Sequence, residues 1–449
     1  MPSTLVLPEL YHMLGQEIPE NIAHVTLSGV AVDSRQVEPG NLFVALKGQR
    51  VDGHDFLLEV EKRGACAAIV EKRASYQDVK IPLICVDDPL KAMQRLARML
   101  VAASGAKVVA VTGSLGKTTT KSFISALLGS KYKIMSTSGN QNSQVGLSLS
   151  ILNNCVGDED YLVLEMGMTE GGHIQRLVEI APPDIAVITF IALVHAASAG
   201  SLEEIARAKM EICSHPQTKV CIINLDSPCQ ELLFQPSTCK KLGYSMIVPH
   251  ADMRLELQDS SMCFHEQAHA TLMPRLALPA AHVYGCMLAA CTVARGCNME
   301  WEEIQRALPT LTLPQGRLQF VEKAGITFID DAYNAAEPSL KAALTVLKEH
   351  GAGRRKVAVI GSMRELGAYS SEAHRAVGEW ALDRADIMVC LGKDCAPIIE
   401  TWQTAARPSF WFLEYDDLLS FLKQELIPGD VVLLKGKRPD DLGRTINLL

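Results

Sequence analysis

The chain has 449 residues, 48% of them apolar, and its 43 basic and 51 acidic residues give a formal net charge of -8. A chain of this length can bury several hydrophobic cores, and at about 150 residues per domain we expect about three domains. The acidic balance argues against a broad nucleic-acid or anionic-membrane surface, because either partner needs an excess of lysine and arginine on one face. Anionic ligands must then be bound at local sites.

Thirteen cysteines are scattered along the chain without a C-x-x-C pair. An odd number cannot be fully paired in disulfides, so we expect reduced thiols and a cytoplasmic protein. The first residues, MPSTLVLPELYHMLG, lack a basic segment followed by a long apolar one, and no apolar stretch reaches the roughly 18 residues that a membrane span needs. The sequence therefore predicts neither export nor membrane insertion.

The first part of the chain predicts a compact α/β domain over residues 1–103. Short β-like runs occur at residues 41–46 (NLFVAL), 66–70 (CAAIV) and 82–86 (PLICV). A helical stretch follows from Pro89 to Ala103. Short strands mixed with helices are typical of an α/β unit.

Residues 107–122, KVVAVTGSLGKTTTKS, have the layout of a phosphate-binding loop. The apolar run at 108–111 predicts a buried parallel strand, and a helical pattern follows the loop. Gly113 and Gly116 allow the backbone to turn so tightly that its N–H groups converge on phosphate oxygens at a helix N-terminus.

The end of this loop predicts the chemistry of the site. Lys117 is expected to reach the outer phosphates of a bound ligand, and Thr118 to bind Mg²⁺. The general pattern G-x-x-x-x-G-K-[ST] is met except at its first glycine, where Val111 stands.

Strands and helices alternate from Val108 to about Leu313, which predicts parallel β-α-β units in a central domain over residues 104–314. Ligands of such sheets bind at the carboxyl ends of the strands. The predicted strand 161–164 delivers Glu165 to that edge, and we expect Glu165 to bind Mg²⁺. A solvated carboxylate at the rim is the alternative.

Two further candidates follow in the central domain. The predicted strand from Ile185 to Phe190 leads to a loop with His195, and the amphipathic helix SLEEIARAKMEI from Ser201 carries Lys209. Periodicity alone favours a structural histidine and a lysine on a solvated face.

The segment from Pro314 repeats the alternation with ITFIDD, KVAVIGS, DIMVCLG and DVVLLKG. It predicts a smaller Rossmann-like domain over residues 315–449. The loop GSMRELG at 361–367 follows a strand but lacks the G-x-G-x-x-G pattern of a dinucleotide site. Residues 265–269, HEQAH, match the zinc-protease pattern H-E-x-x-H, but the prolines at 274 and 279 and the surrounding β-like runs argue against the helix that this pattern needs.

Taken in order, the motifs of the chain resemble those of the Mur ligase family. They are GSLGKTTT, TSGNQNSQVG, LEMGM, His195 with SLEEIARAKMEI, LPQGRL, DDAYNAAEPS, GSMRELG with His374, and LLKGKR. The segment AVDSRQVEPGNLFVALKGQRVDGHDF is similar to the uridine-nucleotide motif of the family's first domain. The likeness covers nearly the full chain. It implies an N-terminal mixed α/β UDP-binding domain, a central parallel-sheet P-loop ATPase domain and a C-terminal Rossmann-like domain.

The resemblance implies a set of site residues. ATP would be bound by Thr112, Gly113, Ser114, Leu115, Gly116, Lys117, Thr118, Thr119, Arg317, Asp331 and Asn334. The UDP-sugar would be bound by Ser34, Arg35, Asp52, Gly53 and His54, and its peptide by Asn140 and Asn142. Two Mg²⁺ ions would be held by Thr118, Glu165, His195 and Lys209, the last as a carbamate. The residues expected to serve catalysis are Lys117, Lys209 and His195. The family usually has asparagine at Ser143, Gly285 and Ala336 and aspartate at Ser362, so these four positions are not expected site residues.

The implied reaction is the ATP-dependent joining of D-alanyl-D-alanine to UDP-N-acetylmuramoyl-tripeptide through an acyl phosphate, in peptidoglycan precursor synthesis. The expected protein is a cytoplasmic monomer without nucleic-acid partners. One alternative is a sibling ligase that adds a single amino acid, of the diaminopimelate-adding or folate-polyglutamate type. The third domain lacks a D-N-P-R motif, and VDSRQVEPGNLFVALKG argues against a folate substrate. A nucleotide-dependent switch that binds UDP-sugars without ligation is the second alternative.

Overall fold

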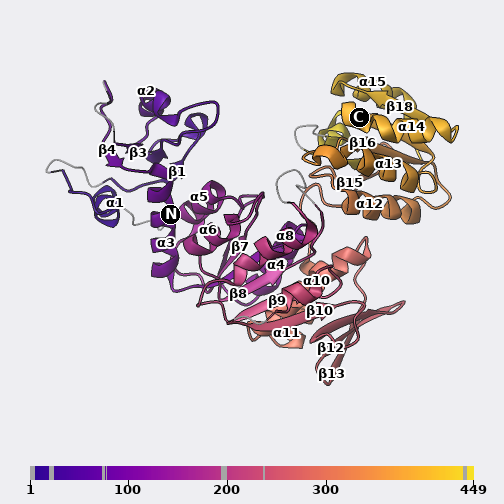
Figure 1. Ribbon diagram of the computed structural model, residues 1–449, viewed down its shortest axis with the longest axis horizontal. Coiled ribbons are helices and arrows are strands. Elements are labelled where there is room, and N and C mark those ends of the chain that lie inside the picture. Colours follow the sequence, from indigo (N-terminus) through magenta and orange to yellow (C-terminus); the bar gives the residue numbers. More distant parts are fainter. Residues whose placement is uncertain are drawn as a thin grey trace.

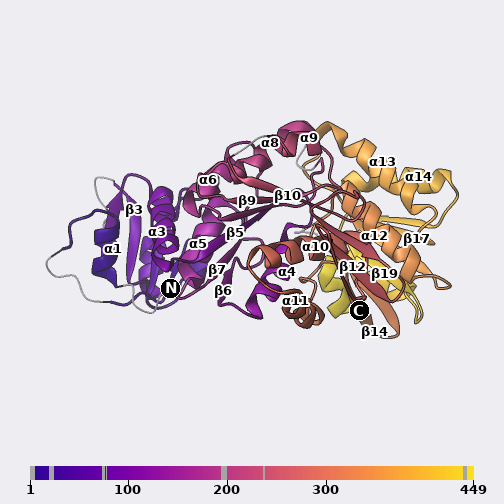
Figure 2. The ribbon, with the colours of Figure 1, turned by 90° about the horizontal axis from the view of Figure 1, so that it is seen from below.

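The computed structural model describes residues 6–19, 25–72, 76, 78–193, 200–235, 238–437 and 442–449. Figure 1 shows three lobes that follow one another along the chain. Within the described residues, the sheets of these lobes have four, nine and six strands. Figure 2, turned by 90°, shows the middle lobe between the other two. The predicted α/β class with three sheet-centred parts is confirmed.

The four strands of the first sheet are parallel and lie in chain order. They are β1 Gly29–Ala31, β2 Asn41–Val44, β3 Ala67–Glu71 and β4 Leu83–Val86. The helices of this lobe are α1 Leu7–Met13, η1 Ser34–Gln36, η2 Gly53–Phe56, α2 Leu57–Lys62 and α3 Pro89–Ser104. The three predicted strands and the predicted helix of this region are thus confirmed.

The ends of α3 follow from its sequence. The Asp88 side chain accepts a hydrogen bond from the backbone N–H of Lys91, and Pro89 occupies the first helical position, where its missing N–H costs nothing. Gly105, with φ of +66°, ends the helix in the left-handed conformation that glycine adopts freely. The helix therefore ends just before β5 begins.

Helix α3 also joins the first lobe to the middle one. Its buried Met93 belongs to a cluster that contains Ile69 of β3 and Leu162 of β7 (Tyr161–Glu165). The Asn153 side chain, from the middle lobe, accepts a hydrogen bond from the Val30 N–H (2.7 Å) and donates one to the Val30 carbonyl (3.0 Å). This amide pairs the edge of β1 as a further strand would.

The middle sheet has the order β13-β12-β11-β10-β9-β8-β5-β7-β6. Its strands are β5 Lys107–Thr112, β6 Ile134–Ser136, β7, β8 Ile185–Ile188, β9 Val220–Asn224, β10 Lys240–Ser245, β11 Met253–Leu257, β12 Ser261–Glu266 and β13 His269–Pro274. Its helices are α4 Lys117–Gly129, α5 Gln144–Asn154, α6 His173–Ile180, α8 Leu202–Met210, η3 Glu211–Cys213, α9 Gln230–Leu233, α10 Ala281–Gly296, α11 Trp301–Ala307 and η4 Leu308–Thr310. The pairs from β5 to β11 are parallel, as predicted, whereas β12 pairs antiparallel with β11 and β13.

The antiparallel hairpin contains the HEQAH segment. His265 and Glu266 end β12, and Glu266 stands opposite His269 of β13. The Glu266 carboxylate accepts hydrogen bonds from Arg295 (2.9 Å) and from the indole of Trp301 (3.1 Å). The segment is therefore not helical, and its glutamate connects the hairpin to α10 and α11.

Strand β8 is two residues shorter than predicted. It ends at Ile188, and the next two residues serve the phosphate loop instead of the sheet. Thr189 directs its hydroxyl at the carbonyl oxygens of Thr112 and Leu115, and the Phe190 carbonyl accepts hydrogen bonds from loop N–H groups.

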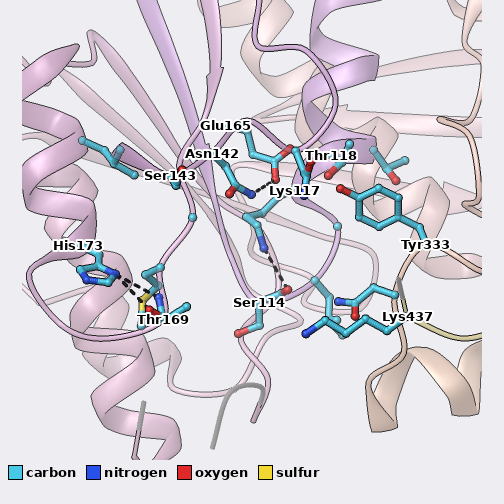
Figure 3. A pocket seen from close by; sticks show the side chains of 18 of the residues that line it. Ser114, Lys117, Thr118, Asn142, Ser143, Glu165, Thr169, His173, Tyr333 and Lys437 are labelled. Atoms are coloured by element: carbon cyan, nitrogen blue, oxygen red, sulfur yellow. Dashed lines mark hydrogen bonds between the residues drawn. The ribbon is translucent and has the colours of Figure 1, made fainter. Parts of the chain in front are cut away.

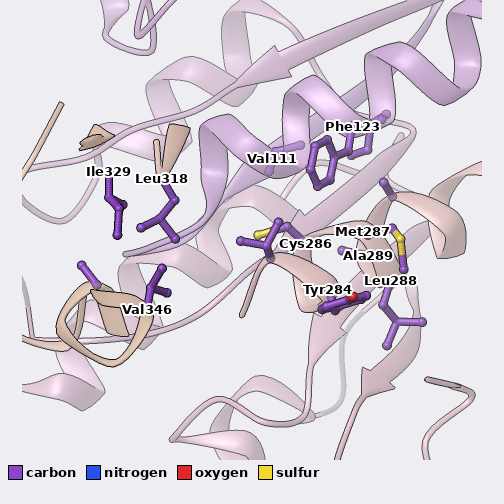
Figure 4. Close-up of a cluster of buried hydrophobic side chains, with 14 of the residues drawn as sticks. Val111, Phe123, Tyr284, Cys286, Met287, Leu288, Ala289, Leu318, Ile329 and Val346 are labelled. Carbon is purple, nitrogen blue, oxygen red and sulfur yellow. The ribbon is translucent and has the colours of Figure 1, made fainter. Parts of the chain in front are cut away.

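The two faces of the middle sheet belong to different cores, because successive side chains of a strand point to opposite sides. Val108 of β5 faces the cluster shared with α3, while Val111 faces α4 and α10. Figure 4 shows Val111 of β5 and Phe123 of α4 beside Cys286 of α10. The same cluster continues to Ile329 in the third lobe, so the middle and third lobes share apolar contacts.

The third sheet has the order β14-β15-β19-β16-β17-β18. Its strands are β14 Gln319–Lys323, β15 Ile326–Asp330, β16 Lys356–Gly361, β17 Ile387–Leu391, β18 Ser409–Phe412 and β19 Val431–Lys435. Its helices are α12 Glu337–His350, η5 Gly367–Tyr369, α13 Ser370–Ala381, η6 Lys393–Cys395, α14 Ala396–Thr404, α15 Tyr415–Glu425, η7 Leu442–Arg444 and α16 Thr445–Leu448. Only β14 is antiparallel to its neighbour, so the Rossmann-like prediction and its four strands are confirmed. In the described part of the chain, no helix is both long and apolar enough to cross a bilayer.

Candidate active site

The turn between β5 and α4 has a backbone that requires glycine. Gly113 has φ of +148°, and a Cβ atom there would stand 1.8 Å from the Thr189 hydroxyl oxygen. Gly116 has φ of +83° and caps α4. The Thr189 hydroxyl lies 2.6 Å from the Leu115 carbonyl oxygen and 3.1 Å from that of Thr112, which clamps the turn to the end of β8.

The amides of the loop fall into two groups. Those of Ser114 and Leu115 both donate to the Phe190 carbonyl, at 2.8 and 3.2 Å. The N–H groups of residues 116–119 make no hydrogen bond to any described residue. Unpaired amides at a helix N-terminus form an anion site. The amides available to a phosphate are therefore those at the start of α4.

Lys117 folds back over this loop, as Figure 3 shows. Its ammonium group donates to the carbonyl oxygens of Gly113 (2.9 Å) and Ser114 (3.3 Å). Burial lowers the pKa of Lys117, nearby Glu165 raises it, and nearby Arg317 lowers it again. An anion at the loop would favour the charged form of this lysine.

Glu165 ends β7 and is 1% exposed. Its Oε1 accepts a hydrogen bond from the Asn142 side chain (2.8 Å), while its Oε2 has no hydrogen-bond partner among the described residues. The Lys121 ammonium lies 3.9 Å from Oε2 and donates to the carbonyl oxygens of Thr137 and Gly139. A buried carboxylate oxygen without a donor is costly unless a cation approaches it.

Lys117, Asn142 and Glu165 line one cavity of about 620 Å³. Besides Asn140, Asn142 and Glu165, its wall includes residues 114–119 from the phosphate loop and residues of all three lobes, namely Leu90, Thr169, His173, Arg317, Tyr333, Asn334 and Lys437. We call it the central cavity. In Figure 3, His173 and Thr169 lie on one side of Lys117, and Tyr333 and Lys437 lie on the other.

The donors of the central cavity fit Mg²⁺ in part. The open Glu165 oxygen and the Thr118 hydroxyl are the oxygen ligands that Mg²⁺ prefers, and Mg²⁺ keeps several water or phosphate ligands besides. No cluster of three or more histidine, cysteine or acidic side chains gathers within the described ranges. His195, predicted as a ligand of a second ion, lies outside them.

Lys209 is buried, so a position on a solvated face is wrong for it. Helix α8 begins with a capping box between Ser201 and Glu204, which sets its register. Lys209 is 3% exposed, and its ammonium makes no hydrogen bond or ion pair with a described residue. Burial lowers the pKa of Lys209 well below its usual value, and the charge of Lys117 lowers it further. Its neutral amine is therefore favoured.

The third lobe presents a stacked pair to the loop. The Arg317 guanidinium lies 4.2 Å from the centre of the Tyr333 ring, and both line the central cavity beside Asn334. Asp331, predicted to meet ATP, lies behind them and forms a buried ion pair with Lys435 (2.6 Å). Because Lys435 also donates to the Asn334 carbonyl (2.9 Å), the ion pair supports the turn that carries Asn334.

The uridine-nucleotide motif lies in the first lobe, away from the central cavity. Asp33 caps η1, and its hydrogen bond with the Arg35 side chain lowers the pKa of Asp33 to about 2. The Arg35 side chain is 82% exposed, whereas Ser34 is buried. Of the two predicted residues here, Arg35 is the more exposed.

The second half of that motif is held rigidly. His54 is buried, its Nε2 accepts a hydrogen bond from the Glu71 N–H (3.0 Å), and its Nδ1 donates to Asp52 (2.5 Å). A Cβ atom at Gly53 would stand 2.8 Å from the Leu46 nitrogen. The predicted residues Asp52, Gly53 and His54 thus fix the shape of this turn.

A second cavity, of about 590 Å³, lies at the carboxyl ends of β16, β17 and β18. Its charged lining residues are Arg364, Glu365, Lys393, Asp394, Glu414 and Arg444. The GSMRELG loop forms part of its wall, although it has no dinucleotide pattern. Glu365 of this loop pairs with Lys437 of the central cavity at 2.7 Å.

Several residues of the site are absent from the predicted set. Lys121 follows Lys117 by one helical turn, so a lysine at i+4 on the same helix face was the available signal. Tyr333 stands inside the DDAYNAAEPS motif, and Lys437 inside LLKGKR. His173 carries no signal in the sequence, because only the fold brings α6 to the cavity.

Three family models match consecutive parts of the chain. "Mur ligase family, catalytic domain" matches residues 26–100, "Mur ligase middle domain" residues 111–294 and "Mur ligase, glutamate ligase domain" residues 316–438. A UDP-N-acetylmuramoyl-tripeptide:D-alanyl-D-alanine ligase of Bacillus subtilis is 34% identical over 426 residues, which cover 92% of this chain and 91% of the relative.

Solved structures agree over the whole length. The crystal structure of MurF from Acinetobacter baumannii matches with a TM-score of 0.86 at 27% identity, over 100% of this chain and 99% of that one. MurF from Thermotoga maritima in complex with ADP matches with a TM-score of 0.78 at 29% identity, over 95% and 98%.

We expect Lys121→Met to destabilise the protein by about 3 kcal/mol, because it removes the lysine that is paired with the buried Glu165 carboxylate. Urea unfolding measures this loss. In the Lys121→Met background, Glu165→Gln should recover part of it. Lys131→Met, which removes a more exposed pair with Glu303, should cost under about 1 kcal/mol. An equal, small loss in both lysine variants would contradict the buried charge pair.

Proposed function

The chain belongs to the Mur ligase family, and we infer that it is an ATP-dependent ligase that joins D-alanyl-D-alanine to UDP-N-acetylmuramoyl-tripeptide. One observation carries this inference. Lys117, Arg317 and the amides of residues 116–119, which have no partner within the described part of the chain, converge on a single cavity to which all three lobes contribute. The enzyme thereby acts in peptidoglycan precursor synthesis.

The reaction proceeds in two steps, and the free energy of ATP cleavage is retained in the intermediate between them. An oxygen of the terminal carboxylate attacks the γ-phosphorus and displaces ADP, which gives an acyl phosphate. The dipeptide amine then attacks the carbonyl carbon, expels phosphate and loses a proton. In the first step an anion approaches an anionic chain of phosphates, so the protein must neutralise charge and align the reactants.

The phosphate loop supplies this neutralisation. The amides of residues 116–119 bind phosphate oxygens, and Lys117 exchanges its own loop carbonyls for the outer phosphates. Arg317, whose Nε has no hydrogen-bond partner among the described residues, meets the same anion from the third lobe. Asn334, placed by the Asp331 ion pair, lies beside the nucleotide. Thr112 and Gly113 act through the shape of the turn.

We propose that Glu165 and Thr118 hold one Mg²⁺ and that Lys209 and His195 hold a second. The ions supply positive charge to the transferring phosphoryl group. Asn142 fixes one oxygen of Glu165 and leaves the other open to the cation. An ammonium group cannot bind a cation, since it has no lone pair.

A carbamate on Lys209 would replace the ammonium group with oxygen atoms that can bind the cation. The neutral amine of Lys209 attacks carbon dioxide, one proton leaves, and a carboxylate-like group results. The burial of Lys209 and the charge of Lys117 support this step, because both favour the neutral amine.

We propose the division 1–103, 104–314 and 315–449 for the three domains. Ser34, Arg35, Asp52, Gly53 and His54 place the UDP-sugar at the first domain, and Asn140 and Asn142 receive its peptide in the central cavity. The second cavity, which mixes both signs of charge, receives the dipeptide. We place the enzyme in the cytoplasm as a monomer, since one chain supplies all three lobes of the site.

The two alternative functions predict different substrate requirements. A sibling ligase would accept a single amino acid, whereas the full-length relative at 34% identity is an enzyme for D-alanyl-D-alanine. A nucleotide switch would hydrolyse ATP without the dipeptide.

We therefore expect phosphate release from ATP to require both the sugar-tripeptide and the dipeptide. Lys117→Ala should lower turnover at least several hundred-fold with the fold intact, because one lost donor to the transferring group costs about 3 to 4 kcal/mol. A phosphate-release assay and a thermal melt measure the two quantities. Dipeptide-independent hydrolysis would favour a switch, and near-normal activity of Lys117→Ala would remove the loop from the mechanism.

We expect isotope-labelled bicarbonate to give a carbamate carbon signal in the NMR spectrum of the wild-type enzyme. Lys209→Arg should lack it, because a guanidinium does not form this adduct, whereas Lys131→Met should keep it. A wild-type spectrum without the signal at saturating bicarbonate would count against the carbamate.

A further inference from the structure

The ion pair between Lys437 and Glu365 lies where the two cavities of the site adjoin. Lys437 lines the central cavity with Lys117 and Arg317, and Glu365 lines the second cavity. Their charged groups are 2.7 Å apart. The pair therefore joins the lining of one cavity to the lining of the other.

The loop that carries Glu365 is built to hold it in place. Glu365 has φ of +65°, in the left-handed region that is strained for a residue other than glycine. The side chains of Met363 and Leu366 are buried on either side. The Met363 N–H donates to Nε2 of fully buried His374 (3.0 Å), and Nδ1 of His374 donates to the Ser370 carbonyl (2.7 Å). The loop is thus anchored from within while Glu365 faces the cavity.

The charges of the second cavity match a zwitterion. Three basic side chains, Arg364, Lys393 and Arg444, share its wall with three acidic ones, Glu365, Asp394 and Glu414. A free dipeptide carries one ammonium and one carboxylate group at neutral pH. Of the acidic groups, Glu365 is the one bonded to a residue of the central cavity, where the amine must arrive.

We propose that Glu365 binds the ammonium group of the incoming dipeptide and that this group replaces Lys437 as its partner. This inference rests on the proposed ligase function. The pair can exchange, because the Glu365 side chain is 48% exposed and ion pairs of that kind contribute little stability. Once released, Lys437 adds its positive charge to the phosphate side of the central cavity. Dipeptide binding and charge neutralisation at the acyl phosphate are thereby coupled.

The two members of the pair should respond differently to substitution. Glu365→Gln should raise KM for the dipeptide about 10-fold or more, because a charged hydrogen bond is lost, while KM for ATP and for the sugar-tripeptide stays within about twofold. Glu365→Asp should recover part of the loss. Lys437→Met should lower kcat without raising KM for the dipeptide, since it removes the competitor for Glu365. A merely structural pair would raise this KM in both variants.

Steady-state kinetics with each substrate varied in turn tests the proposal. Asp383→Asn is the matched control, since it neutralises an exposed carboxylate that pairs with Lys348 of the same lobe outside both cavities, and it should change KM for the dipeptide by less than about twofold. A dipeptide analogue with a hydroxyl in place of the ammonium should inhibit wild type and Glu365→Gln equally.

Two results would overturn the role of Glu365. Normal wild-type ligation together with an unchanged dipeptide KM in Glu365→Gln would refute this role and leave the ligase function standing. Failure of the wild-type enzyme to form any ligated product would refute the ligase function and this inference with it.

Discussion

The buried carboxylate of Glu165 is the interaction on which the site depends. One oxygen is fixed by Asn142, and the other lies 3.9 Å from Lys121 and has no hydrogen-bond donor among the described residues. A carboxylate in this position is stable only with positive charge close by. The same requirement governs the reaction, because two anionic substrates must meet. The folded state and the reaction therefore both depend on positively charged groups gathered at the edge of the middle sheet.

Each of the three lobes contributes a different part of the site. The middle lobe supplies the phosphate loop, whose turn depends on glycine at position 113 because Thr189 occupies the space of a Cβ atom. The third lobe adds Arg317 and Asn334 from a turn that the buried Asp331–Lys435 pair supports. The first lobe is tied to the middle one through α3 and through the amide of Asn153, so its nucleotide motif keeps a fixed relation to α5.

The sequence predicts much of this arrangement because local patterns decide it. The glycines of the loop, the apolar run of β5 and the strand that ends at Glu165 each carry their own signal, and all lie where expected. The early end of β8 could not be predicted, because the Thr189 hydroxyl and the Phe190 carbonyl form hydrogen bonds with the phosphate loop, which lies far away in the sequence. Lys209 resembles a solvated helix residue until packing buries it. Glu365 and Lys437 belong to separate motifs, and only the third sheet brings them together. The roles of His195 and of the first-lobe motif stay predictions.

In the reaction described above, the cationic cavity turns an inert carboxylate into an acyl phosphate. Isotope tracing tests it most directly, with sugar-tripeptide whose terminal carboxylate carries heavy oxygen, ATP and dipeptide. One labelled oxygen should appear in the released inorganic phosphate for each amide bond formed. Release of unlabelled phosphate alongside amide formation would contradict it.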